Sequence, residues 1–133
     1  MNKKNIRLDV SDRAERIQSA ISELKQQISA IKNSGQVAPT DCYVARYQAR
    51  GQKYRYWYYQ LKASQPIFPK STKKSELSRF KHLGVSGSQG HIDGVMAVVR
   101  RGQIEELTKA ISSLEESLLD LFSDEEKVGN RVE

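Results

Sequence analysis

The sequence predicts an α+β fold: an antiparallel helical pair, forming a coiled-coil-like stalk, with a two- to three-stranded antiparallel sheet capping one end. Heptad stripes near both ends of the chain predict the helices, and a central run rich in aromatic residues predicts the sheet. The chain has 133 residues, the length of one domain. We expect a single domain over 1–133, with an N-terminal helix at 11–34, the sheet and a basic loop at 42–83, a long C-terminal helix at 90–123, and flexible tails at 1–10 and 124–133.

The N-terminal helix is expected to begin at Ser11, a residue type that caps helices well. It is expected to stop at Gly35, which favours the left-handed conformation that follows many helices. Between these two residues the apolar positions advance in alternating steps of three and four, the spacing of a coiled-coil face. This stripe consists of Ala14, Ile17, Ile21, Leu24, Ile28 and Ile31.

The C-terminal helix repeats the pattern with Ile104, Leu107, Ile111, Leu114, Leu118 and Leu121. Each stripe covers about 27 Å of helix. The equal lengths favour an antiparallel pair, with Ala14 near Leu121 and Ile31 near Ile104. A parallel homodimeric coiled coil through either helix is the alternative. The expected interaction surface is Ile17, Ile21, Leu24, Ile28, Leu107, Ile111, Leu114 and Leu118.

The first part of the C-terminal helix carries a separate apolar stripe that does not keep phase with the heptads. Its members are Ile92, Val95, Met96 and Val99, and we expect them to pack on the sheet. Gly102 lies where the phase changes, which indicates a bend or the close approach of a neighbouring element. Near the end of the helix, Leu119 and Phe122 widen the heptad stripe enough to cover a third element or a dimer mate.

Residues 42–62 are expected to form a β-hairpin around Gly51 and Gln52, which fit a two-residue type II′ loop. Strand partners then have residue numbers that sum to 103, and alternation sorts their side chains into two faces. We expect the uncharged face to be the core side; it carries Tyr43, Ala45, Tyr47, Ala49, Tyr54, Tyr56 and Tyr58. The opposite face is basic, with Trp57 and Tyr59 set among arginines, and is expected to face solvent.

Basic residues are concentrated in the middle of the chain. The whole sequence has 22 Lys and Arg against 16 Asp and Glu, but residues 42–101 hold 12 basic and 2 acidic residues, a net charge of +10. Such a block favours a polyanion, because Lys and Arg neutralise phosphates and aromatic rings stack on unpaired bases. The expected nucleic-acid-binding residues are Arg46, Arg50, Lys53, Arg55, Trp57, Lys73, Lys74, Lys81, Arg100 and Arg101. The alternative is a solvated sheet surface whose aromatic residues lie under the following loop.

The segment after the hairpin supplies anchors, a strand and a turn. Ile67 and Phe68 are expected to pack on the domain, and residues 78–83 alternate like a short third strand. The glycine-rich run 84–90 does not match a phosphate-binding loop for nucleotides. It is expected to be a connection into the helix, with the binding of one nucleic-acid phosphate as a weaker alternative.

Few residues suit catalysis or metal binding. His82, His91 and Asp93 have no recognised ligand spacing, and Cys42, as the one cysteine, forms neither an internal disulfide nor a cysteine zinc site. We therefore expect a protein that is not an enzyme and that has no metal and no cofactor. No apolar run is long enough to span a bilayer, and the N-terminus lacks a secretory signal. The sequence therefore predicts a cytoplasmic protein without a membrane partner.

Residues 56–64, 66–69 and 81–84, followed by a long helix rich in Arg, Glu and Leu, resemble small uncharacterised bacterial proteins that place an aromatic β-hairpin between two helices. The resemblance covers roughly residues 40–122. It implies an association with plasmids and other mobile elements and a DNA-related accessory role. It implies no catalytic or ligand residue.

Together these features predict a nucleic-acid-binding accessory or regulatory protein, with DNA favoured over RNA. The basic hairpin face would contact phosphates, Trp57 would stack on a base or wedge between bases, and the helices would form a homodimer or dock a larger protein. The alternative is a protein-interaction adaptor that acts through its heptad helices and makes no nucleic-acid contact. A third alternative, a small enzyme, would need titratable groups clustered around His82, His91 and Asp93.

Overall fold

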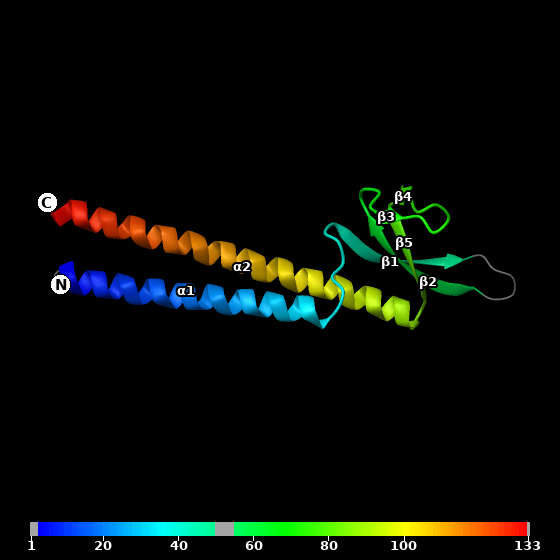
Figure 1. Cartoon of the computed structure of the whole chain (residues 1–133), viewed down its shortest axis with the longest axis horizontal. Coiled ribbons are helices and arrows are strands. Elements are labelled where there is room, and N and C mark those ends of the chain that lie inside the picture. The colour runs from blue at the N-terminus through cyan, green and yellow to red at the C-terminus, as the bar shows by residue number, and fades with distance from the viewer. Residues whose placement is uncertain (1–2, 50–54, 133) are drawn as a thin grey trace. The chain divides into compact units, whose positions relative to one another are not determined.

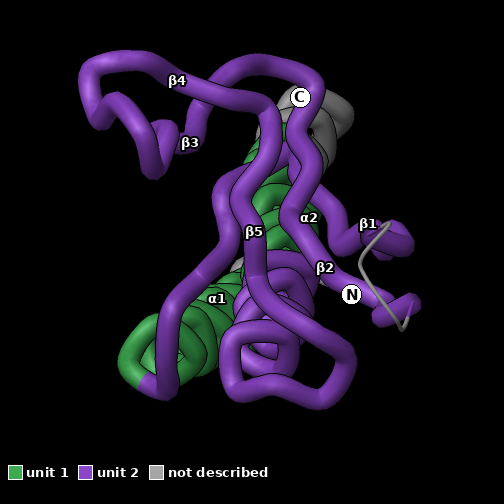
Figure 2. Tube along the Cα trace, turned by 90° about the vertical axis from the view of Figure 1, so that its right-hand side faces the viewer, with its two compact units in different colours: residues 1–33, 104–133 green, residues 34–103 purple. Residues whose placement is uncertain are grey.

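The computed structural model describes residues 3–49 and 55–132, and the side chains of residues 9–49 and 55–123. The elements are α1 (Lys3–Ser34), β1 (Cys42–Ala49), β2 (Tyr56–Ala63), β3 (Phe68–Pro69), β4 (Leu77–Ser78), β5 (Phe80–Val85) and α2 (Gln89–Val132) (Figure 1). The predicted α+β class and antiparallel sheet are confirmed. The chain divides into two compact units: a helical unit of residues 1–33 and 104–133, and a sheet unit of residues 34–103 (Figure 2).

The helical unit buries the two stripes that the heptad spacing predicts. Every position of both stripes is buried or half-buried. Val10, Ala14 and Leu121 form one buried cluster, with Ile17 and Leu118 packed against it. Ala14 and Leu121 therefore lie in the same cluster, as the alignment of the two stripes predicts.

Both helices are longer than predicted. Because α1 begins at Lys3, Ser11 lies inside the helix, and its assignment as the N-terminal cap is wrong. The helix ends at Ser34 as expected, but Gly35 does not have a positive φ. At the other end of the chain, α2 continues to Val132, so helix extends into both segments that were assigned to flexible tails. No helix in the described part of the chain has the length and apolar character needed to cross a membrane.

The main sheet of the sheet unit has the strand order β1-β2-β5, and both pairs are antiparallel. β5 is the third strand that the alternation at 78–83 predicts, displaced by two residues, while β3 and β4 form a separate two-stranded sheet. The predicted hairpin register is wrong by two positions, because partners sum to 105: Val44 faces Leu61 instead of Tyr59. A slip of two keeps every side chain on its face, so the sorting into two faces is correct.

The choice of the buried face is wrong. The core contains Cys42, Leu61 and Ala63 from the face expected to be solvent-exposed, with Val44 packed against it. Ala38, Phe68 and Ala97 complete this core. Phe68 is thus an anchor as predicted, whereas Ile67 is exposed. The small and aliphatic residues at the base of the hairpin suit close packing against a helix, whereas the tyrosines can leave their hydroxyls in water.

Two glycines of α2 make this close packing possible. A Cβ atom at Gly90 would lie 2.1 Å from the carbonyl oxygen of Leu83, and one at Gly94 would lie 2.5 Å from the Leu83 Cδ1. Leu83 is the extra residue of a β-bulge, because Tyr59 pairs with Gly84 while Gln60 pairs with His82. The bulged residue thus sits against the surface that the two glycines leave open.

The stripe of α2 that was expected to cover the sheet does not do so. Ile92, Met96 and Val99 are exposed, and the buried positions of this part of the helix are Gly94 and Ala97 instead. Gly102 does not mark a close approach, because no atom lies within 4 Å of a Cβ atom placed there. It lies next to the boundary between the two units, where one helix passes from one unit into the other.

Candidate nucleic-acid interface

The face of the main sheet opposite the core carries the largest group of exposed aromatic residues in the described chain. We call it the open face: Tyr43, Tyr56, Phe80 and His82, which are exposed, and Tyr47, Tyr58, Gln60 and Lys62, which are half-buried. The strand register arranges these side chains in rows across the sheet. The first row is Tyr43, Lys62 and Phe80. The second row is Ala45, Gln60 and His82, and the third row is Tyr47, Tyr58 and Val85.

The third row contains rings that hold one another in place. The rings of Tyr47 and Tyr58 are stacked, with centroids 5.8 Å apart and 23° between their planes. His82 joins them, because its ring lies 5.7 Å from Tyr58 and its Nδ1 is hydrogen-bonded to the Tyr47 hydroxyl at 3.0 Å. The cluster is therefore fixed by ring contacts and one hydrogen bond, while His82 stays exposed.

The first row combines an aromatic ring with positive charge. Phe80 is 42% exposed, although its side chain is entirely apolar. The ammonium of Lys62 lies 5.8 Å from the centre of the Phe80 ring and the guanidinium carbon of Arg79 lies 5.7 Å from it. Tyr43, at the other end of the row, is 54% exposed. The accessible rings can contact bases while the cations beside them contact phosphates.

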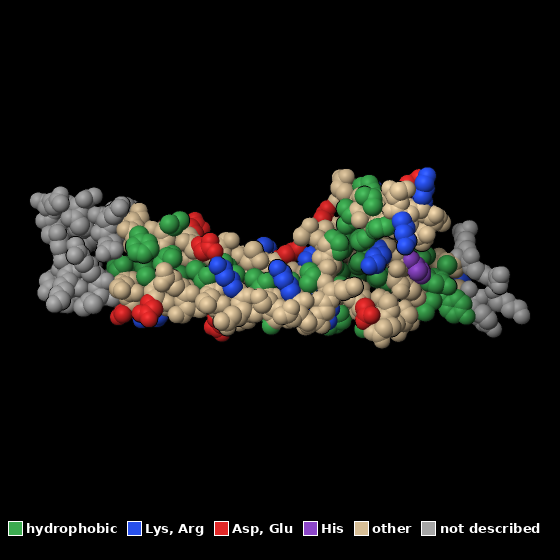
Figure 3. All heavy atoms as spheres, viewed as in Figure 1, with side chains coloured by type: hydrophobic (Ala, Val, Ile, Leu, Met, Phe, Trp, Pro, Cys, Tyr) green, Lys and Arg blue, Asp and Glu red, His purple; other side chains and the backbone are tan. Residues whose placement is uncertain are grey.

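Positive charge is not confined to this row. The sheet unit has 12 Lys and Arg against 3 Asp and Glu, a net charge of +9, and the helical unit has 10 against 13, a net charge of −3. Figure 3 shows Lys and Arg side chains beside hydrophobic ones over the strands. A surface of this composition attracts a polyanion over a distance of several ångströms at physiological salt.

Of the hairpin residues predicted to bind nucleic acid, Arg46 and Trp57 lie on the other face. Arg46 and Trp57 are brought together there, with the guanidinium carbon 4.1 Å from the centre of the indole ring. The neighbouring Tyr59 stacks on His91 of α2, with ring centroids 3.7 Å apart, so this part of the face is covered. Arg55 is exposed beside β2. Arg50 and Lys53 lie outside the described residues, as does Tyr54.

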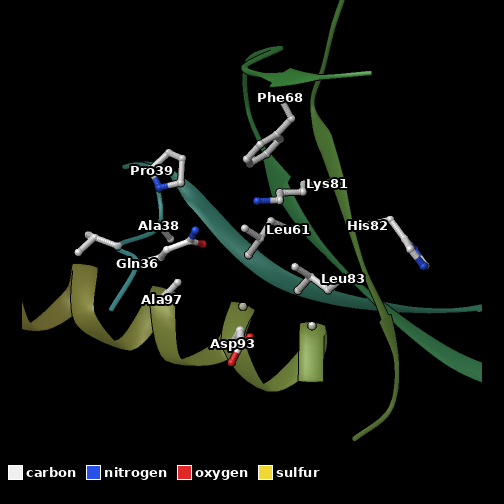
Figure 4. A pocket seen from close by; sticks show the side chains of 13 residues that line it. Gln36, Ala38, Pro39, Leu61, Phe68, Lys81, His82, Leu83, Asp93 and Ala97 are labelled. Carbon is white, nitrogen blue, oxygen red and sulfur yellow. The ribbon is translucent and has the colours of Figure 1, made fainter. Parts of the chain in front are cut away.

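The predicted lysines are scattered. Lys73 lies in the connection between β3 and β4, where it pairs with Glu76 at 3.4 Å, and Lys74 follows it. Lys81 is on the core side of β5, and its side chain reaches across a pocket between Phe68 and Leu61, while His82 points away (Figure 4). The pocket has a volume of about 380 Å³ and also includes Asp93 of α2. It could accept an apolar group with a negative charge close to Lys81.

Arg100 and Arg101 have structural roles. Arg100 donates hydrogen bonds to the Ser34 hydroxyl at 3.2 Å and to the Gln36 carbonyl at 3.1 Å, and its guanidinium lies against Gly35. Arg101 donates to the carbonyls of Pro39, at 2.9 Å, and Cys42. Together the two arginines fasten the connection between α1 and β1 onto α2 with their N–H donors.

The titratable residues do not form a metal-binding group in the part of the chain that the structure describes. No group of three His, Cys, Asp or Glu side chains there is placed to hold a metal ion. His82 and His91 contact aromatic residues on opposite faces of the sheet. Cys42 is buried, and burial raises the pKa of its thiol although Arg101 acts in the opposite direction. At neutral pH the thiol is therefore protonated and a poor nucleophile.

Comparison with protein-family models, with curated proteins and with solved structures finds no significant match. The resemblance to mobile-element proteins and the cytoplasmic location therefore stay predictions.

The open face was not predicted from the sequence, although alternation sorts its tyrosines correctly. Four hairpin residues carried the signal that distinguishes the two faces: Cys42, Val44, Leu61 and Ala63. They are small or aliphatic, and they occur together at the base of the hairpin, where a helix packs. Lys62, Arg79 and Phe80 were missed because only the pairing of β5 with β2 brings them together.

Proposed function

We propose that the protein binds nucleic acid through the open face of its sheet. The observation that carries the proposal is the exposed ring of Phe80 between Lys62 and Arg79, beside the cluster of Tyr47, Tyr58 and His82. Exposed aromatic rings offer faces for bases, and the adjoining cations offer contacts for phosphates. The net charge of +9 on the sheet unit supports the same partner.

A pair of charge-reversal variants tests which face binds. Lys62→Glu/Arg79→Glu changes the open face, and Arg46→Glu/Arg55→Glu makes the same change in net charge on the opposite face. We expect the first variant to lower affinity for labelled DNA or RNA at least about tenfold more than the second, measured by fluorescence anisotropy at about 0.15 M salt. The Debye length is then about 8 Å, so charges far from the bound strand contribute little.

Circular dichroism should first show that both variants are folded. Should the Arg46/Arg55 variant lose more affinity, the basic face predicted from the sequence would be the binding surface. Equal affinity of both variants and the unchanged protein would place binding outside the sheet, against the proposal.

A second candidate function, self-association through the helical unit, rests on two apolar residues beside the buried stripe of α2. Leu119 is 71% exposed and Phe122 is 48% exposed. We propose that the two stripes pair antiparallel as a short coiled coil, supported by the cluster of Val10, Ala14 and Leu121. Leu119 and Phe122 would then meet a second copy of the chain.

Leu119→Glu/Phe122→Glu should convert a dimer into a monomer at micromolar concentration, because it places charge in an apolar contact. Sedimentation velocity measures the change. Ser112→Glu/Ser117→Glu adds the same charge at exposed positions of the same helix and should leave the dimer intact. A monomeric unchanged protein at all concentrations would exclude self-association.

A further inference from the structure

The composition of the open face favours unpaired bases over a duplex. Phosphate and sugar contacts make up half to two-thirds of the hydrogen bonds between protein and duplex DNA, so a duplex reader needs many donors and cations. The open face has six aromatic rings, those of Tyr43, Tyr47, Tyr56, Tyr58, Phe80 and His82. Its described cations are Lys62 and the adjoining Arg79. In a duplex, the faces of the bases are already stacked on one another and cannot contact these rings.

From this composition we propose that the site takes single-stranded nucleic acid, with at least one unpaired base stacked on Phe80 and the adjoining phosphates held by Lys62 and Arg79. This inference rests on the proposed function and specifies its ligand. Phe80 is the anchor because its ring is accessible, flanked by both cations, and without a polar group of its own. Stacking on such a ring tolerates any base, because every base has a π-face.

The row spacing provides a second position for a base. Residues two apart on a strand lie about 6.6 Å apart, so the cluster of Tyr47, Tyr58 and His82 begins one to two rows from Phe80. The cluster is held by its own hydrogen bond and ring contacts, so little conformational freedom remains to be lost on binding. Gln60 lies between the two ring groups, where its amide can donate to and accept from the edge of a base.

The test compares four labelled probes of equal length by fluorescence anisotropy: oligo(dT), oligo(rU), an abasic strand with the same phosphates, and a DNA duplex. We expect at least one of the two base-bearing single strands to bind about tenfold or more tighter than the duplex and the abasic strand. Phe80→Ala should weaken the binding of that strand about 5- to 150-fold. Phe80→Tyr, which keeps a ring, should retain most of the affinity.

The cations are tested separately through the salt dependence. Each phosphate contact to a single strand contributes about −0.7 to the slope of log affinity against log salt. Lys62→Gln/Arg79→Gln should therefore make the slope about 1.4 less negative, whereas Phe80→Ala should leave the slope unchanged.

The outcomes separate this inference from the proposed function. A duplex that binds as tightly as the single strands, with the same affinity for Phe80→Ala, would overturn the inference and leave open-face binding standing. An abasic strand that binds as tightly as oligo(dT) and oligo(rU) would also overturn it, because the contacts would then be to phosphates alone. If no probe binds at low salt, both the inference and the proposed function fail.

Discussion

Gly90→Ala is expected to lower the free energy of unfolding of the sheet unit by about 2 kcal/mol or more. The new Cβ would lie 2.1 Å from the carbonyl oxygen of Leu83, and backbone cannot move away as a flexible side chain can. Overpacking costs about 1–3 kcal/mol, and the shift here displaces a strand of the sheet. The gain in helix propensity, at most about 1 kcal/mol, is smaller than this cost. Thermal unfolding should show a fall in Tm of about 8–16 °C.

Two other glycines of the same helix provide matched controls. At Gly94 the contact is with the end of the Leu83 side chain, which can rotate, so Gly94→Ala should be less destabilising. At Gly102 the surrounding space is open, so Gly102→Ala should stabilise the protein by up to about 1 kcal/mol. A Gly90→Ala variant as stable as Gly102→Ala would contradict the packing of β5 against α2.

Arg101→Met is expected to destabilise the sheet unit by about 2–4 kcal/mol. Methionine keeps an apolar stem of similar length but removes the hydrogen bonds to the carbonyls of Pro39 and Cys42. Hydrogen bonds from charged groups contribute about 1.5–3 kcal/mol, and the carbonyl of the buried Cys42 would be left without this donor. Urea unfolding, followed by circular dichroism, measures the loss.

Arg79→Met is the matched control, because the same substitution removes an exposed guanidinium. We expect a crossed result. Arg101→Met should lower stability and leave the nucleic-acid affinity of the folded protein unchanged, whereas Arg79→Met should lower affinity with little change in stability. If Arg101→Met weakens binding without loss of stability, Arg101 belongs to the binding surface, as the sequence predicts.

The regular features of the fold were predictable from periodicity. The heptad positions from Ala14 to Ile31 and from Ile104 to Leu121 are all buried or half-buried, because one stripe of an amphipathic helix packs against its neighbour. Alternation likewise placed the hairpin side chains on the correct faces, because successive side chains of a strand point to opposite faces. The register was wrong because a turn motif was used to set it. The last described pair is Ala49 and Tyr56, and the turn predicted at Gly51 and Gln52 lies outside the described residues.

The proposed binding surface was harder to predict because tyrosine suits both a core and a surface. The positive charge of the hairpin predicted a nucleic-acid site on the face of Arg46. Part of that face is covered by α2, whose His91 stacks on Tyr59. The two arginines at 100 and 101 illustrate the same difficulty, since a local sequence of basic residues does not reveal which carbonyls they meet. These contacts join residues about 60 positions apart, beyond the reach of a local pattern.

The link between Arg100 and Ser34 has a consequence for the order of folding. These residues lie close to the two ends of the sheet unit, which is continuous in sequence, whereas the helical unit is assembled from the two segments that flank it. Closing a loop of 70 residues costs about 4 kcal/mol in chain entropy. If the sheet unit forms first, the chain entropy of closing this loop has already been lost. The two heptad segments then associate as if a short connection joined them. Early formation of the sheet unit would therefore speed the association of the helices.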